Sequence, residues 1–104
     1  MSVWHETQVE HVIDAIDNIV DEHGNTDELI RIRNIVSEAW VHVTDLPKNS
    51  AESMKLIEKS IKLFEKAEVL VDKAKETVPV NQERDWRILR NRVRSAKVAV
   101  VEAD

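Results

Sequence analysis

Apolar residues recur every three or four positions over four long segments, which is the spacing of one face of an α-helix. The pattern predicts helices over about residues 3–23, 26–44, 50–77 and 82–102. The apolar positions are Val9, Val12, Ile16 and Ile19, then Leu29, Ile32, Val36, Ala39 and Val43, then Leu56, Leu63, Ala67, Leu70 and Ala74, and finally Trp86, Leu89, Val93, Ala96 and Val100. No segment shows the alternation of a half-buried strand.

Polar segments that contain Gly or Pro separate the four predicted helices. These segments are HGNTD (23–27), TDLPKNS (44–50) and TVPVNQ (77–82). Gly24 suits the position just past a helix end, and Asn25, Asn49 and Asn81 suit helix N-caps. Because short connections favour antiparallel neighbours, the sequence predicts one all-α domain over residues 1–104. Its expected architecture is a four-helix antiparallel bundle, up-down-up-down, with the third helix longest.

The third predicted helix carries a second apolar stripe beside the first, which widens its apolar arc beyond half the circumference. The second helix also has apolar residues off its stripe. Two alternatives explain this surplus: the third helix packs on two neighbours, or part of it forms a subunit interface. The interface alternative predicts a homodimer. Its candidate partner-binding residues are Ile30, Trp40, Val41, Ile57, Ile61 and Phe64. Phe64 and Leu89 are also predicted to be core residues.

Composition restricts the class of protein. The chain has 104 residues, of which 42% are hydrophobic and 34% charged, as in a globular domain with a charged surface. It has no cysteine, which excludes disulfides and cysteine-based metal sites. It lacks both an apolar run of about 18 residues and the apolar core of a signal peptide. We therefore expect a soluble cytoplasmic protein with no membrane partner.

The net charge of −5 conceals a separation of acids from bases. Residues 1–50 carry ten acids and three bases, whereas residues 51–104 carry ten acids and twelve bases. Acids follow helical spacing along the first predicted helix, at Glu6, Glu10, Asp14, Asp17 and Asp21. Bases follow it along the fourth helix, at Arg87, Arg90, Arg94 and Lys97, with Arg84 and Arg92 off this stripe.

Both charged stripes lie on the same flank of their own apolar seams. Since like flanks of antiparallel neighbours face each other, we expect Arg87, Arg90 and Arg94 to pair with carboxylates of the first helix. A change of Arg90→Glu should then be partly compensated by Asp17→Lys.

Two alternatives assign these charges to partners. Unpaired acids of the first helix would form a ridge for a basic protein surface, with Glu10, Asp14, Asp17 and Asp21 as candidates. The bases would instead bind nucleic acid or another anionic ligand, with Arg84, Arg87, Arg90, Arg92, Arg94 and Lys97 as candidates. The net acidic charge and the scarcity of aromatic residues weigh against nucleic acid.

Motifs for catalysis or metal binding are scarce. The four histidines, His5, His11, His23 and His42, contain no i,i+4 pair and no Glu-x-x-His motif. A single glycine, Gly24, cannot form a phosphate-binding loop. We therefore expect no catalytic residue, no metal site and no cofactor.

One arrangement of carboxylates keeps an enzymatic alternative open. Asp14-x-x-Asp17 in the first helix, and Glu65-x-x-Glu68 followed by Asp72 in the third, resemble the pairs that hold Mg²⁺ in all-helical nucleotide pyrophosphohydrolases. The sequence departs from the Glu-rich motifs of that family and has no matched pair in the fourth helix. The resemblance implies a Mg²⁺-dependent hydrolase as a third alternative.

The sequence thus favours a non-enzymatic helical interaction protein, such as an adaptor, regulator or inhibitor. It would act through contacts with itself and with an unidentified protein partner. A binder of nucleic acid or anionic ligands that uses the arginine-rich fourth helix is the second alternative.

Overall fold

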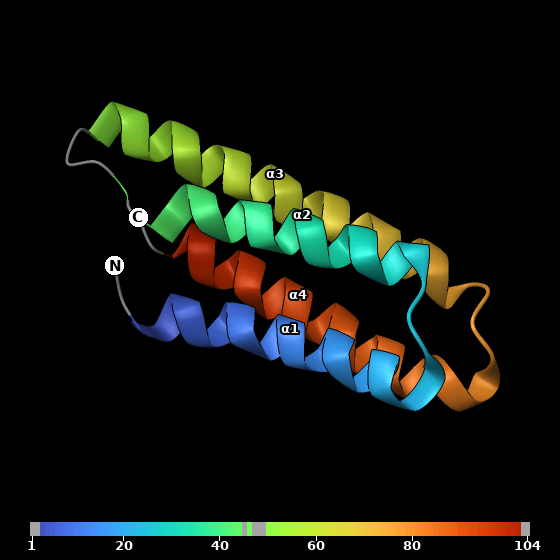
Figure 1. Cartoon of the computed structure of the whole chain (residues 1–104). Helices are drawn as coiled ribbons and strands as arrows, with labels where there is room; N and C mark the ends of the chain where they lie inside the picture. Colours follow the sequence, from blue (N-terminus) through green and yellow to red (C-terminus); the bar gives the residue numbers. More distant parts are fainter. Residues whose placement is uncertain (1–2, 45, 47–49, 103–104) are drawn as a thin grey trace.

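The computed structural model consists of four α-helices and one short 3₁₀ helix (Figure 1). It describes the backbone of residues 3–44, 46 and 50–102, and the side chains of these residues except 3–6 and 50. The helices are α1 (Val3–His23), α2 (Asp27–Thr44), α3 (Ser50–Lys75), η1 (Val80–Gln82) and α4 (Glu83–Val101). The predicted helices are confirmed, and α3 is the longest of them.

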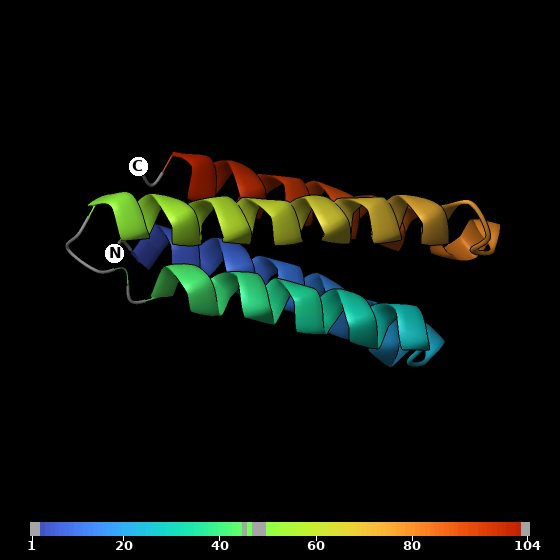
Figure 2. The ribbon, with the colours of Figure 1, turned by 90° about the horizontal axis from the view of Figure 1, so that it is seen from above.

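Successive helices run antiparallel and form an elongated bundle of 47 × 22 × 19 Å (Figures 1 and 2). Helix α1 packs against α2 and α4, and α3 packs against the same two helices from the opposite corner. The predicted up-down-up-down arrangement is therefore confirmed. Within the described residues, no helix has both the length and the apolar character needed to cross a bilayer.

The turn between α1 and α2 shows how the chain reverses direction. Gly24 has a φ of 92°, and its N–H donates to the Val20 carbonyl at 2.9 Å, which ends α1. Thr26 then caps α2, since its Oγ1 accepts the Leu29 N–H at 3.3 Å. Asn25 instead accepts the Thr26 N–H through Oδ1 at 3.0 Å. The predicted cap is therefore wrong by one residue.

The start of α4 also differs from its prediction. Asn81 lies inside η1, where the chain makes a 3₁₀ turn after Pro79. The N-cap of α4 is Gln82, whose side chain makes no capping hydrogen bond. The prediction that Asn81 caps this helix is thus wrong, because the 3₁₀ turn moves the helix start. The predicted cap at Asn49 lies outside the described residues.

One apolar core runs through the bundle and takes residues from all four α-helices. Phe64 and Leu89 are completely buried, which confirms both as core residues. The second apolar stripe of α3 belongs to this core too, since Ile57 is buried and Ile61 packs against it. The prediction that Ile57 and Phe64 lie in a subunit interface is corrected, because the chain's own helices cover them. Ile61 is only partly buried, so its place in an interface stays a prediction.

The seams between neighbouring helices differ in how closely the helices approach. The Oγ of buried Ser60 in α3 donates to the Ala39 carbonyl of α2 at 2.9 Å, so these helices meet at small residues. Helices α1 and α2 pack less closely than the other three neighbouring pairs. Larger side chains, including Trp40 and Arg33, lie along this α1–α2 seam. A surface depression opens along this seam.

Candidate functional site

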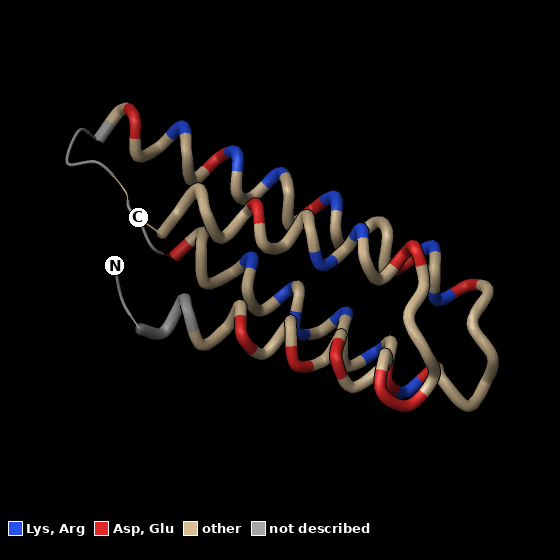
Figure 3. The backbone as a smooth tube through the Cα atoms, viewed as in Figure 1, with Lys and Arg blue, Asp and Glu red and all other residues tan. Residues whose placement is uncertain are grey.

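Charged residues are separated between the helices in space as well as in sequence. Figure 3 shows acids along α1, bases along α4, and acids and bases interspersed along α3. An acid and a base neutralise each other only where their side chains form an ion pair. The ion pairs between neighbouring helices therefore show which charged side chains remain free.

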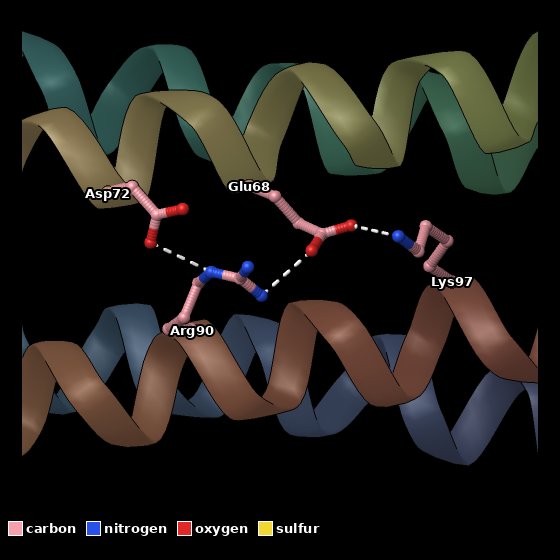
Figure 4. A network of polar contacts seen from close by, with 4 residues as sticks. All are labelled: Glu68, Asp72, Arg90 and Lys97. Atoms are coloured by element: carbon pink, nitrogen blue, oxygen red, sulfur yellow. Dashed lines mark hydrogen bonds and ion pairs between the residues drawn. The ribbon is translucent and has the colours of Figure 1, made fainter.

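A four-residue network fills the seam between α3 and α4 (Figure 4). The carboxylate of Glu68 is about nine-tenths buried and lies 2.8 Å from Arg90 Nη1 and 2.6 Å from Lys97 Nζ. The Lys97 contact is an ion pair rather than a well-aligned hydrogen bond. Arg90 also donates through Nε to Asp72 Oδ1 at 2.8 Å. Two bases of α4 are therefore neutralised by α3.

This network corrects the expected pairing of Arg90 with α1. Arg90 and Lys97 of the basic stripe face α3, and Asp17 of the acidic stripe faces α2, where its Oδ1 accepts from Arg33 Nη2 at 2.7 Å. The sequence pattern does not specify on which side of α1 its two neighbours lie, and the handedness of the bundle decides that.

Several charged candidates remain free after this pairing. Glu10, Asp14 and Asp21 are exposed and form no ion pair with any side chain that the structure describes. The side chain of Glu6 lies outside the described residues. On α4, the exposed bases without an ion pair in the described part of the chain are Arg84, Arg87, Arg92 and Arg94. Of these free acids, Glu10 and Asp14 lie beside the α1–α2 seam.

An apolar groove of about 410 Å³ opens between α1 and α2. We call it the α1–α2 groove. Its lining residues are Val9, Glu10, Ile13, Asp14, Ser37, Trp40 and Val41. Trp40 is half-buried against the core, whereas Val41 is 68% exposed and presents an apolar side chain to solvent. Glu10 and Asp14 add two free carboxylates to a lining that is apolar apart from these acids and Ser37.

The α1–α2 groove brings together four of the residues proposed from the sequence, namely Trp40, Val41, Glu10 and Asp14. It does not include Ile30, which is 45% exposed elsewhere on α2. The sequence alone did not identify Val9 and Ile13 as groove residues. A signal existed for Ile13, which is an apolar residue one position outside the main stripe of α1.

The carboxylates that resemble a Mg²⁺ site do not converge. Asp17 is paired with Arg33, whereas Glu68 and Asp72 are paired with Arg90. These acids face different seams, because Asp17 faces α2 and Glu68 faces α4. Among the described residues, one group of three side chains has the spacing to hold a metal ion, and it contains none of these acids.

Comparison with other proteins does not assign a family. The chain has no significant match to a protein-family model, a curated protein or a solved structure. The fold places the protein in the class of all-α four-helix bundles, and its function has to be argued from its own residues.

Proposed function

We propose that this protein is a non-enzymatic interaction protein whose α1–α2 groove binds a basic amphipathic helix of another protein. The observation that carries the proposal is the coincidence of exposed apolar side chains with free carboxylates in one groove. An exposed apolar surface with a polar rim is typical of protein-binding sites. The partner's apolar face would cover Val41 and Trp40, and its bases would meet Glu10 and Asp14.

The shape of the groove favours a helix as the bound element. Val9 and Ile13 are one turn apart on α1, and Trp40 and Val41 lie on α2 across the seam. Two helices that flank an apolar depression can receive a third helix, whose anchors recur at i, i+3 or i+4. Lysine or arginine beside those anchors would find the two carboxylates, which supplies orientation and association rate more than affinity.

A second copy of this chain is a poorer occupant of the groove. A symmetric dimer through this face would bring the same patch of both copies together and oppose Glu10 and Asp14 with their own counterparts. The exposed lysines of α3 lie on the corner of the bundle opposite to α1, so a second copy could bring them into the groove only through a larger interface that also covers α3. The homodimer predicted from the sequence therefore stays a prediction and requires another surface.

A designed peptide can test the groove whatever the natural partner is. The probe is a fluorescent helical peptide of about 18 residues, with leucines at i and i+4 and lysines beside them. We expect saturable binding by fluorescence anisotropy. Val41→Glu should weaken binding at least about tenfold, or about 1.4 kcal/mol, since a charge replaces an apolar contact. The matched control is Val80→Glu, because Val80 is 82% exposed on η1 and outside the groove.

The charges of the probe provide a second control. A peptide with glutamates in place of the lysines should bind far more weakly at low salt, and Asp14→Lys should reduce the difference between the two peptides. Equal binding of both peptides would contradict the role of the carboxylates. Equal losses of peptide affinity in Val41→Glu and Val80→Glu would contradict the proposed location of the binding site.

Four free arginines support a second candidate function, the binding of an anionic ligand such as nucleic acid. Arg84, Arg87, Arg92 and Arg94 are exposed and form no ion pair within the described residues. If they bind phosphates, a labelled single-stranded RNA or DNA should be retarded in a gel, and the complex should weaken steeply with salt. Arg87→Glu with Arg94→Glu should abolish the shift, whereas Lys62→Glu should not. No shift at about 50 mM salt, where phosphate contacts are strong, would remove this candidate.

A further inference from the structure

We propose that Glu22, His23 and Asp85 form a binding site for a divalent transition-metal ion of the Zn²⁺ type. His23 is in the last turn of α1, and Asp85 is in the first turn of α4. One ligand atom from each of the three side chains lies within 4.8 Å of the other two. This site is separate from the α1–α2 groove and does not depend on the function proposed for it.

The spacing of the ligand atoms fits a tetrahedral ion. Zinc binds imidazole nitrogen and carboxylate oxygen at about 2.0–2.2 Å, so two ligand atoms at the tetrahedral angle are about 3.4 Å apart. His23 Nε2 lies 3.1 Å from Asp85 Oδ2 and 3.7 Å from Glu22 Oε2. The two distances lie on either side of the tetrahedral value, and the Glu22 and Asp85 oxygens lie within 4.8 Å of each other. A rotation of the exposed Glu22 side chain would bring all three atoms to one ion.

The fold holds two of the ligands in place. The side chains of His23 and Asp85 are 14% and 18% exposed, and they come from helices that pack along each other. These residues are 62 positions apart in sequence, so the site exists only when α1 and α4 are docked. Glu22 is 57% exposed and can rotate to complete the ligand set. A bound ion would therefore join α1 to α4.

The kinds of ligand indicate the class of metal. Mg²⁺ and Ca²⁺ prefer oxygen ligands alone, whereas an imidazole nitrogen with carboxylates suits Zn²⁺ and neighbouring transition metals. Two carboxylates offset the charge of a divalent ion, and a neutral imidazole adds none. Three protein ligands leave a fourth position for water. The sequence prediction of no metal site followed from histidine spacing along the chain, which cannot detect ligands from distant helices.

Titration of the whole chain with zinc chloride tests the site. We expect one ion per chain by calorimetry. A free concentration about ten times the Kd should raise the Tm by roughly 5–10 °C, because the ion binds the folded chain. Asp85→Asn keeps the size of the side chain and should weaken Zn²⁺ binding about tenfold or more, and His23→Ala should do the same.

A second histidine provides the matched control. His42 Nε2 lies 4.0 Å from Glu38 Oε1, so His42→Ala also removes an imidazole beside a carboxylate but should leave Zn²⁺ binding unchanged. Co²⁺ gives a direct readout, since four- or five-fold coordination produces strong visible absorption that Asp85→Asn should abolish. Binding lost in His42→Ala but retained in Asp85→Asn would overturn the proposal. So would the absence of saturable binding, in which case His23 and Asp85 form only a hydrogen bond.

Discussion

Replacing Phe64 with alanine is expected to lower the free energy of unfolding by about 3–5 kcal/mol. The side chain is completely buried in the centre of α3 and is among the largest fully buried side chains of the described core. Its removal loses burial of the aromatic ring and leaves a cavity that the neighbouring helices can fill only in part. Since domains are stable by about 5–15 kcal/mol, this change would remove a large part of the total.

Urea unfolding followed by circular dichroism measures the effect of Phe64→Ala. The midpoint should fall while the slope stays constant, since the surface exposed on unfolding is almost unchanged. Val69→Ala is the matched control, because Val69 is on the same helix but 53% exposed. This change should alter the free energy of unfolding by no more than about 0.5 kcal/mol. A loss under about 0.5 kcal/mol for Phe64→Ala would mean that the side chain faces solvent.

The second large effect is expected at Glu68. Glu68→Ala should cost roughly 2–3 kcal/mol, because it leaves Arg90 and Lys97 beside each other without the carboxylate that they share. A double-mutant cycle with Arg90→Ala should give a coupling energy of about 0.5–3 kcal/mol, as expected for residues in one network. Unfolding in urea at low and high salt measures each corner of the cycle.

Asp17 is the control for this cycle. The charge-swap experiment suggested by the sequence combines Arg90→Glu with Asp17→Lys, and the structure now predicts no compensation, because Asp17 pairs with Arg33. The effects of Arg90→Ala and Asp17→Ala should therefore add within about 0.5 kcal/mol. A coupling between Arg90 and Asp17 larger than that between Arg90 and Glu68 would contradict the arrangement of helices in Figure 4.

The sequence predicted the helices and the buried faces of α1, α2 and α4 well, because both depend on local periodicity. In α3 the predicted main stripe was wrong. Ile57, Phe64 and Val71 of the second stripe are buried, whereas Leu56, Leu63 and Leu70 of the first are only partly buried. Apolar spacing identifies the side of each helix that leaves water, and Phe64 and Leu89 are buried as expected. The helix starts were less accurate. Asn25 and Asn81 both have the chemistry of a cap, but Thr26 and a 3₁₀ turn occupy those positions. Caps depend on backbone torsions of single residues, which composition does not determine.

The pairing of charged stripes could not be predicted, for a different physical reason. A helix in a square bundle has two neighbours, one on each flank, and its own sequence does not state which neighbour is on which flank. Arg90 was assigned to α1, although it pairs with α3. The wide apolar arc of α3 also had two possible explanations in the sequence, namely packing on two neighbouring helices or a subunit interface. It is explained by a helix that packs on two neighbours, so Phe64 does not require a second copy.

Sites formed by residues far apart in the sequence could not be predicted either, because the sequence does not specify which helices are neighbours. His23 and Asp85 meet because the end of α1 lies beside the start of α4, and that alignment follows from loop lengths and packing. The α1–α2 groove depends on how far two helices separate, which is set by side chains such as Trp40 along the seam. Periodicity indicated that Trp40 and Val41 were surplus to one apolar stripe, but it did not indicate that they adjoin Ile13.

A residue-by-residue titration tests the proposed docking groove most directly. Heteronuclear NMR spectra of the ¹⁵N-labelled chain, recorded with increasing amounts of the lysine–leucine peptide, report which backbone amides and which indole N–H respond. The proposal predicts saturable shifts at Val9, Ile13, Ser37 and Val41 and at the Trp40 indole, with little change at the Trp86 indole. Shifts confined to α3 and α4, or no saturable shifts, would contradict the assignment of the α1–α2 groove as the docking site.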